Sequence, residues 1–386
     1  MPRTMTIRSI GLTLAWCLVV GAVGGRLGAH ARREPAQHVT LDAVLATYLS
    51  GDTDVIRRTF ARSVDFQDRL RLSEPRELDR WLGSWNRGKA LFVLEIARAA
   101  ATVAPRYSTG LIGAGRRYVG TAPVGDPASR EAAAFAQLWH RTAVALLQAY
   151  GDPWRVEEHV GDLVARAGAG AGPLDARLVL ARGVARERAC WNRRPSLDQP
   201  SSHAGALAKA AGVTVPDDLD GPTKSGREAS VNAHLTCLRD ALAQFEAASC
   251  FDETRAEART RGGWALFLIG RLAEALEWLD AAEPGDDRDL AYWLGLFKGR
   301  VLDGLGRFQP AATAYQRALA LYPGAQSAGV GLALELVRLD RDVEADEVAR
   351  SLRTAGATAP DPWSTYLDGD HRFVERWVAQ LRTGMR

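Results

Sequence analysis

The sequence predicts an all-α protein, because two stretches thirty-six residues apart carry the same small and apolar residues. Internal repetition with a period near thirty-four residues indicates helical hairpins stacked as an α-solenoid. No part of the 386-residue chain shows the sustained alternation of apolar and polar residues that marks a half-buried strand. The repeated residues are Gly263, Leu266, Gly270, Arg271, Ala275, Leu279 and Ala282, which recur as Gly299, Leu302, Gly306, Arg307, Ala311, Tyr315 and Ala318.

Residues 1–31 have the features of a secretory signal peptide. Arg3 and Arg8 precede an apolar run over residues 10–23, and residues 29–31 (Ala-His-Ala) form a small-x-small cleavage site. The run is shorter than the roughly 20 residues that span a bilayer. We therefore expect cleavage and export to the periplasm or the medium. An uncleaved membrane anchor is the alternative.

Apolar residues at three- and four-residue steps predict an irregular helical region over residues 40–192. Residues 105–127 are rich in Gly and Pro, so we expect a connection there, with Gly113-Ala114-Gly115 as a turn. The expected helical segments are a hairpin at 40–64 and helices at 76–104, 128–150, 153–167 and 174–192.

The second half of the chain divides into three parts. Residues 193–229 contain several prolines and are expected to form a linker or surface insertion. Residues 230–358 hold the helical repeats. Residues 360–386 are expected to form a C-terminal, hairpin-like capping unit, because residues 365–370 match residues 47–52 at five of six positions.

The second repeat shows the pattern of its unit most clearly. Gly299 and Ala311 stand where two helices would cross, Gly306-Arg307 makes the turn, and Tyr322-Pro323 closes the unit. This spacing resembles the tetratricopeptide repeat (TPR) family, clearly over residues 256–323 and loosely over 326–356. In the loose copy, Asp340 replaces the turn glycine and Ala349 the aromatic residue. The resemblance is to exported bacterial proteins that contain this repeat.

The resemblance implies a concave groove lined by the first helix of each repeat. Exposed aromatic residues often dominate binding energy, so Trp264, Phe267 and Trp293 are the expected anchors. The alternative is that these rings are packed in the core, since Trp is usually largely buried. The groove-facing positions would be Glu257, Thr260, Trp264 and Phe267 in one repeat and Trp293, Leu296, Arg300 and Asp303 in the next.

Three cysteines follow the signal segment. Cys237 and Cys250 lie thirteen residues apart on one expected helix, about 20 Å, too far for a bond. A disulfide between Cys190 and either Cys237 or Cys250 is therefore expected, and three reduced thiols are the alternative. His234 and Cys237 are three residues apart, but a metal site of Cys190, His203, His234 and Cys237 is not expected, because no short paired spacing brackets His203.

The net charge and the lack of known catalytic motifs limit the classes of function that we expect. The formal charge of +3 falls to about zero once Arg3, Arg8 and Arg26 are removed, so the mature chain lacks the basic field of a nucleic-acid-binding protein. No serine-hydrolase elbow or zinc-protease helix appears. We expect a scaffold that binds a peptide or protein segment, without catalysis or cofactors, and that meets a membrane only if the signal is uncleaved. An envelope-associated helical hydrolase acting on wall polymers is the alternative.

Overall fold

The computed structural model describes most of the chain beyond its first 39 residues. The described ranges are 40–62, 75–122, 127–151, 153–168, 175–192, 224–355 and 360–384. Every regular element in these ranges is helical, so the all-α prediction is confirmed. Expectations for residues 1–31 and for most of 193–229 lie outside them. Within the described part, no helix is both long and apolar enough to cross a lipid bilayer.

The N-terminal half packs its helices around α6, whose side chains are almost all buried. Residues Leu91 to Leu94 are at most 1% exposed, because neighbouring helices surround them. The side chain of Asn86 caps this helix by accepting from the amide of Lys89 at 3.0 Å. The helices are α2 (Leu41–Leu49), α3 (Val55–Thr59), α5 (Pro75–Leu82), α6 (Arg87–Ala101), α7 (Pro105–Val119), α8 (Pro127–Tyr150), α9 (Pro153–Gly168) and α10 (Ala176–Asn192).

The second half consists of successive helix pairs joined by tight turns. Gly270 and Gly306 adopt φ values of 90° and 71° at the two predicted turns. Asp340 keeps the left-handed conformation in the third copy, with φ of 56°, although it has a side chain. The helices are α12 (Lys224–Ser249), α13 (Asp252–Ile269), α14 (Leu272–Asp280), α15 (Arg288–Gly304), α16 (Phe308–Leu321), α17 (Gln326–Arg338) and α18 (Asp342–Ala355).

The C-terminal segment does not form the expected hairpin. A 3₁₀ helix, η1 (Pro362–Phe373), leads directly into α19 (Val374–Thr383). Gly369 interrupts η1 with φ of 60° and ψ of −125°, which redirects the chain. Tyr366 of η1 belongs to the hydrophobic core of the repeats, whereas Trp377 of α19 belongs to the core of the N-terminal half. The segment therefore connects the two cores.

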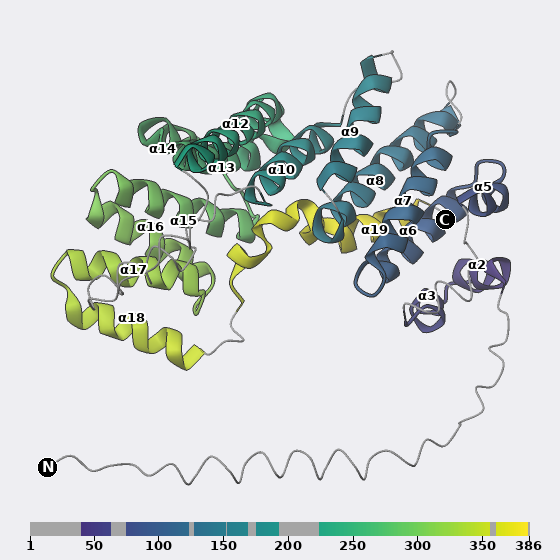
Figure 1. Ribbon diagram of the computed structural model, residues 1–386. Helices are drawn as coiled ribbons and strands as arrows, with labels where there is room; N and C mark the ends of the chain where they lie inside the picture. Colours follow the sequence, from purple (N-terminus) through teal and green to yellow (C-terminus); the bar gives the residue numbers. More distant parts are fainter. Residues whose placement is uncertain are drawn as a thin grey trace, which may run out of the picture.

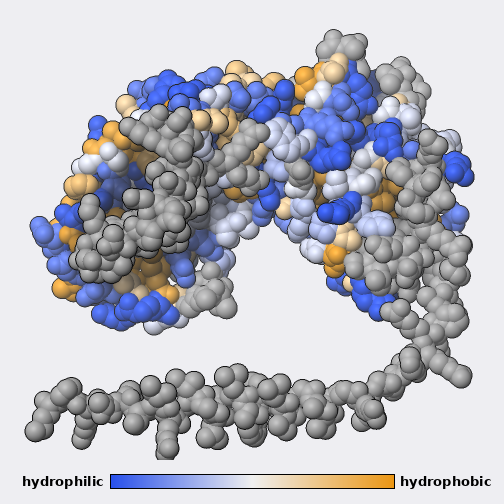
Figure 2. Space-filling model, in the orientation of Figure 1, coloured by the Kyte–Doolittle hydropathy of each residue, from blue (hydrophilic) through white to orange (hydrophobic). Residues whose placement is uncertain are grey.

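The helices together form an arch (Figure 1). Helices α2 to α9 make one arm, α13 to α18 make the other, and α10 and α12 lie between them. The C-terminal segment, yellow in Figure 1, runs along the inner side from one arm to the other. Figure 2 shows a broad hollow below this segment, between the two arms.

Helix α7 replaces the connection expected at residues 105–127. Pro105 occupies the first turn, where its missing N–H leaves no hydrogen bond unmade. Gly115 belongs to the packing rather than to a turn, because a Cβ atom there would lie 2.5 Å from Cζ2 of Trp139. Trp139 is fully buried on α8. The glycine thus permits close approach of two helices, which tertiary packing stabilises despite its low helix propensity.

Replacing Gly115 by Ala should destabilise the protein, because the new methyl group must displace a buried indole ring. We expect the free energy of unfolding in urea to fall by about 1–3 kcal/mol. Gly161→Ala on α9 is the matched control. No atom lies within 4 Å of its Cβ position, so the substitution should raise stability by up to about 1 kcal/mol. Equal effects at both positions would contradict the close packing of α7 on α8.

Candidate functional site on the inner face of the repeats

The first helices of the three helix pairs, α13, α15 and α17, pack side by side in that order. Their groove-facing positions recur from helix to helix at the repeat spacing, so the same helix face is presented three times. This places the sequence-predicted groove residues of α13 and α15 on adjacent helices. The inner face of the repeats is defined here by these positions.

Most of the predicted groove residues are buried. Trp264 and Trp293, expected to be exposed anchors, are only 6% and 1% exposed, so that expectation is wrong for both rings. Of the other predicted positions, Glu257, Thr260 and Leu296 are buried, Phe267 and Asp303 are half-buried, and Arg300 is exposed.

The cover over these residues is the chain's own η1 helix. The ring of Trp363 lies 5.6 Å from that of Trp264, centroid to centroid, and the ring of Tyr366 lies 5.3 Å from that of Trp293. Both contacts are edge-to-face, a favoured geometry for aromatic pairs. Phe297 lies 5.8 Å from Trp363 and 5.2 Å from Tyr366, again edge-to-face. Two aromatic residues of η1 therefore occupy the inner face of α13 and α15.

Hydrogen bonds attach the start of η1 to the repeats. The indole of Trp293 donates to the carbonyl of Pro362 at 2.9 Å. The carboxylate of Asp361 accepts from the hydroxyl of Tyr292 at 2.8 Å and from the amide of Ser327 at 2.7 Å. Because Ser327 begins the third repeat and Tyr292 belongs to the second, one carboxylate holds η1 to two repeats.

Arg261 lies at the centre of the polar contacts and is completely buried. Its guanidinium donates to Glu257 at 2.9 Å and to the carbonyl of Tyr366 at 3.1 Å, and it lies 3.4 Å from Glu187. The hydroxyl of Tyr366 donates to the other oxygen of Glu187 at 2.7 Å. The buried positive charge of Arg261 is thus matched by hydrogen-bond acceptors on α10, α13 and η1.

Two further arginines extend this network toward α19. Arg177 bridges Glu257 at 2.9 Å and Asp370 at 3.1 Å. Arg372 pairs with Glu257 and, at 3.3 Å, with Asp287. The buried-network residues are Arg177, Glu187, Glu257, Arg261, Asp370 and Arg372, and they join α10, α13 and η1.

The carboxyl groups of the buried network have opposite pKa shifts. Burial would raise the pKa of Glu257, but the charges of Arg372, Arg261 and Arg177 outweigh it and hold that pKa well below its ordinary range. Glu187 is farther from the arginines, and burial raises its pKa to about 7, against the opposing charge of Arg261. Glu187 therefore exchanges its proton near neutral pH, whereas Glu257 stays ionised.

The part of the inner face on α17 is open. Val330, Leu334 and Val337 are 61%, 47% and 52% exposed and lie at i, i+4 and i+7, on one face of the helix. They occupy the positions thirty-four residues after Leu296, Arg300 and Asp303. Sequence reasoning missed this stripe, although extending the groove register by one more repeat would have found it.

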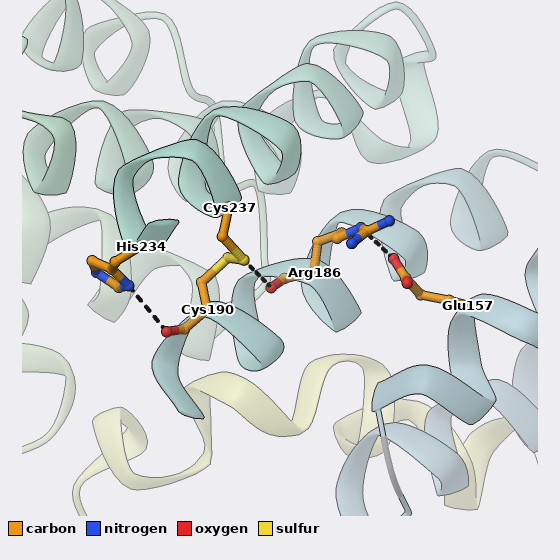
Figure 3. Close-up of a disulfide and its surroundings, with 5 residues drawn as sticks. All are labelled: Glu157, Arg186, Cys190, His234 and Cys237. Atoms are coloured by element: carbon orange, nitrogen blue, oxygen red, sulfur yellow. Dashed lines mark hydrogen bonds and ion pairs between the residues drawn. A yellow bond between two sulfur atoms is a disulfide. The ribbon is translucent and has the colours of Figure 1, made fainter. Parts of the chain in front are cut away.

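A disulfide joins α10 to α12 (Figure 3). It joins Cys190 to Cys237, one of the two expected pairings, across a Cα–Cα distance of 5.6 Å. Cys250 is exposed and free. The ring of His234 contacts the carbonyl of Cys190 at 3.0 Å. His203 lies outside the described residues, and among those described no three His, Cys, Asp or Glu side chains gather as metal ligands.

Comparison of the sequence with protein-family models and with curated proteins finds no match. The assignment of a role therefore depends on the geometry of the site.

Removing the disulfide should destabilise the protein, because the bond closes a loop of 47 residues in the unfolded chain. We expect Cys190→Ser/Cys237→Ser to lower the free energy of unfolding by about 2–4 kcal/mol in urea titrations. Cys250→Ser is the control and should have no effect. A loss no larger than that of the control would contradict a formed bond.

Glu187 should make stability depend on pH. Its pKa of about 7 exceeds the ordinary 4.5, so the folded state keeps a proton that the unfolded chain has released. Its ionisation therefore removes stability as pH rises from about 4.5 to 7, by on the order of 3 kcal/mol. The Glu187→Gln variant cannot ionise at this position. Its Tm, measured relative to that of the wild type, should therefore increase as the pH rises from about 4.5 to 7. A Tm difference that stays constant over this pH range would show that folding does not raise the pKa of Glu187.

Proposed function

We propose that the chain is an exported, TPR-like scaffold that binds a peptide or protein segment on the open part of its inner face, without catalysis. The exposed stripe of Val330, Leu334 and Val337 is the observation that carries this proposal. An apolar stripe on one helix face can pack against the apolar side chains of a docked segment, as in the recognition of amphipathic helices.

The self-bound segment supports this choice of surface. The equivalent faces of α13 and α15 already hold the aromatic rings of Trp363 and Tyr366, so this repeat face accepts apolar side chains. The stripe on α17 continues that face in register and, among the described residues, lies largely exposed. We propose that a partner segment binds next to η1 rather than in its place, since η1 is anchored by the buried network.

Arg300 gives the proposed surface a charge preference. It is exposed at the position on α15 that corresponds to Leu334 on α17, and no ion pair of Arg300 is found within the described ranges. A partner with an apolar anchor beside an Asp or Glu would match both the apolar stripe on α17 and the positive charge of Arg300. We therefore expect an acidic, apolar segment to be preferred over a basic one.

A peptide library displayed on phage and selected on the purified protein tests the proposal. For selected peptides, Leu334→Asp should raise the Kd at least about tenfold in fluorescence polarisation, because it places a carboxylate in the apolar stripe. Val231→Asp on α12 is the control, since Val231 is also a partly exposed apolar residue but lies outside the inner face.

Circular dichroism should show both variants folded, because both sites are exposed. Selected peptides that bind Leu334→Asp as tightly as the wild type would refute this location. Selection of peptides without apolar residues would do the same.

A further inference from the structure

A second concave site lies on the other arm, between α7 and α9. It is a cavity of about 300 Å³, at the lower end of the range for small-molecule sites. Its walls come from residues of α7 between 106 and 117, from Leu147 of α8, and from the start of α9. It shares no residue with the inner face of the repeats.

Arginines surround this cavity. Arg106, Gly110, Gly113 and Arg117 lie at i, i+4, i+7 and i+11, so they form one stripe along α7, and all four line the cavity. Arg116 of α7 and Arg155 of α9 bring further guanidinium groups to the cavity.

The two glycines of this stripe have no packing role. At Gly110 and Gly113 no atom lies within 4 Å of the Cβ position, in contrast to Gly115 on the same helix. Glycine within a helix is unfavourable compared with alanine. Here it leaves the helix backbone bare at the cavity wall, so that a ligand can approach closely.

The positive groups exceed the negative ones. Four arginines line the cavity but only one carboxylate, Glu158, does. Glu158 pairs with Arg155 at 2.9 Å and with Arg116 at 3.4 Å. These pairs are half-exposed and therefore weak.

Two of the arginines that line the cavity form ion pairs with acids that do not line it. Asp79 pairs with Arg117 and Asp162 with Arg116, both at 3.2 Å. Arg106 makes no ion pair with any acid in the described part of the chain.

A buried histidine pair lies at the floor. His159 lines the cavity, and its Nε2 lies 2.9 Å from Nδ1 of His140. Burial, together with the charges of Arg166 and Arg116, lowers the pKa of His140 to about 3. Burial lowers the pKa of His159 as well, so the pair is neutral and the arginines alone supply the positive charge that faces a ligand.

We propose that this cavity binds a small phosphate-bearing molecule, with its phosphate between Arg106, Arg155 and the bare backbone of Gly110 and Gly113. Guanidinium groups match phosphate oxygens bidentately, which makes arginine the preferred residue for such recognition. The proposal is independent of the peptide-binding role, because the two sites lie on different arms.

Calorimetric titration of the full-length protein with glycerol 3-phosphate, and separately with inorganic phosphate, tests this inference. We expect saturable one-to-one binding, weakened about tenfold or more by Arg106→Gln/Arg155→Gln. Arg350→Gln on α18 is the control, being an exposed arginine outside the cavity, and should bind like the wild type.

A second variant separates binding from stability. Gly110→Ala/Gly113→Ala adds methyl groups to the cavity wall in residues that favour the helix, so Tm should not fall while affinity does. Unchanged affinity in this variant, or equal losses in Arg350→Gln and the cavity variant, would overturn the site.

Vesicles of phosphatidylcholine with phosphatidylglycerol distinguish a lipid headgroup from a soluble ligand. Sedimentation with the vesicles that depends on Arg106, without binding of either soluble phosphate, would also overturn the proposal, since the ligand would then be a membrane surface.

Discussion

The arrangement of the two arms depends on the burial of Arg261. A guanidinium without water is stable only when several acceptors surround it, and those acceptors come from α10, α13 and η1 at once. Removing α10 or η1 would leave this buried charge without one of its acceptors. The network therefore fixes η1 in one position more specifically than its aromatic contacts alone would.

The apolar contacts of the C-terminal segment act together with this network. Trp363 and Tyr366 pack on the repeats, whereas Val374, Trp377, Val378 and Leu381 complete the core of the N-terminal half. Arg382 adds a hydrogen bond to the buried Glu95 at 2.8 Å, across 287 residues of sequence. One short segment thus contributes to both hydrophobic cores and connects the two arms.

The sequence predicts those features that depend on local spacing. Helix α8 was found from its three- and four-residue steps, and the turns at Gly270 and Gly306 from their repeated position. Helix α7 was missed because its glycines indicate a loop when taken alone. The reason for Gly115 is a tryptophan on another helix, which local patterns do not contain.

The predicted groove also shows that local patterns do not reveal contacts between distant segments. The repeat register places Trp264 and Trp293 on the inner face, but exposure depends on what lies opposite. The residues that cover them, Trp363 and Tyr366, follow some seventy to one hundred positions later and carry no signal of that contact. The open stripe on α17, in contrast, can be predicted by extending the same repeat register over one more repeat.

The position of η1 also bears on the order of events during synthesis. The ribosome adds about 5–20 residues per second from the N-terminus, so Trp363 and Tyr366 emerge several seconds after the tryptophans that they cover. Until then the tryptophans of α13 and α15 have no cover and Arg261 lacks one of its acceptors. While the residues between Trp293 and Trp363 are being added, the nascent polypeptide thus presents an uncovered apolar surface, which is the kind of surface that chaperones protect.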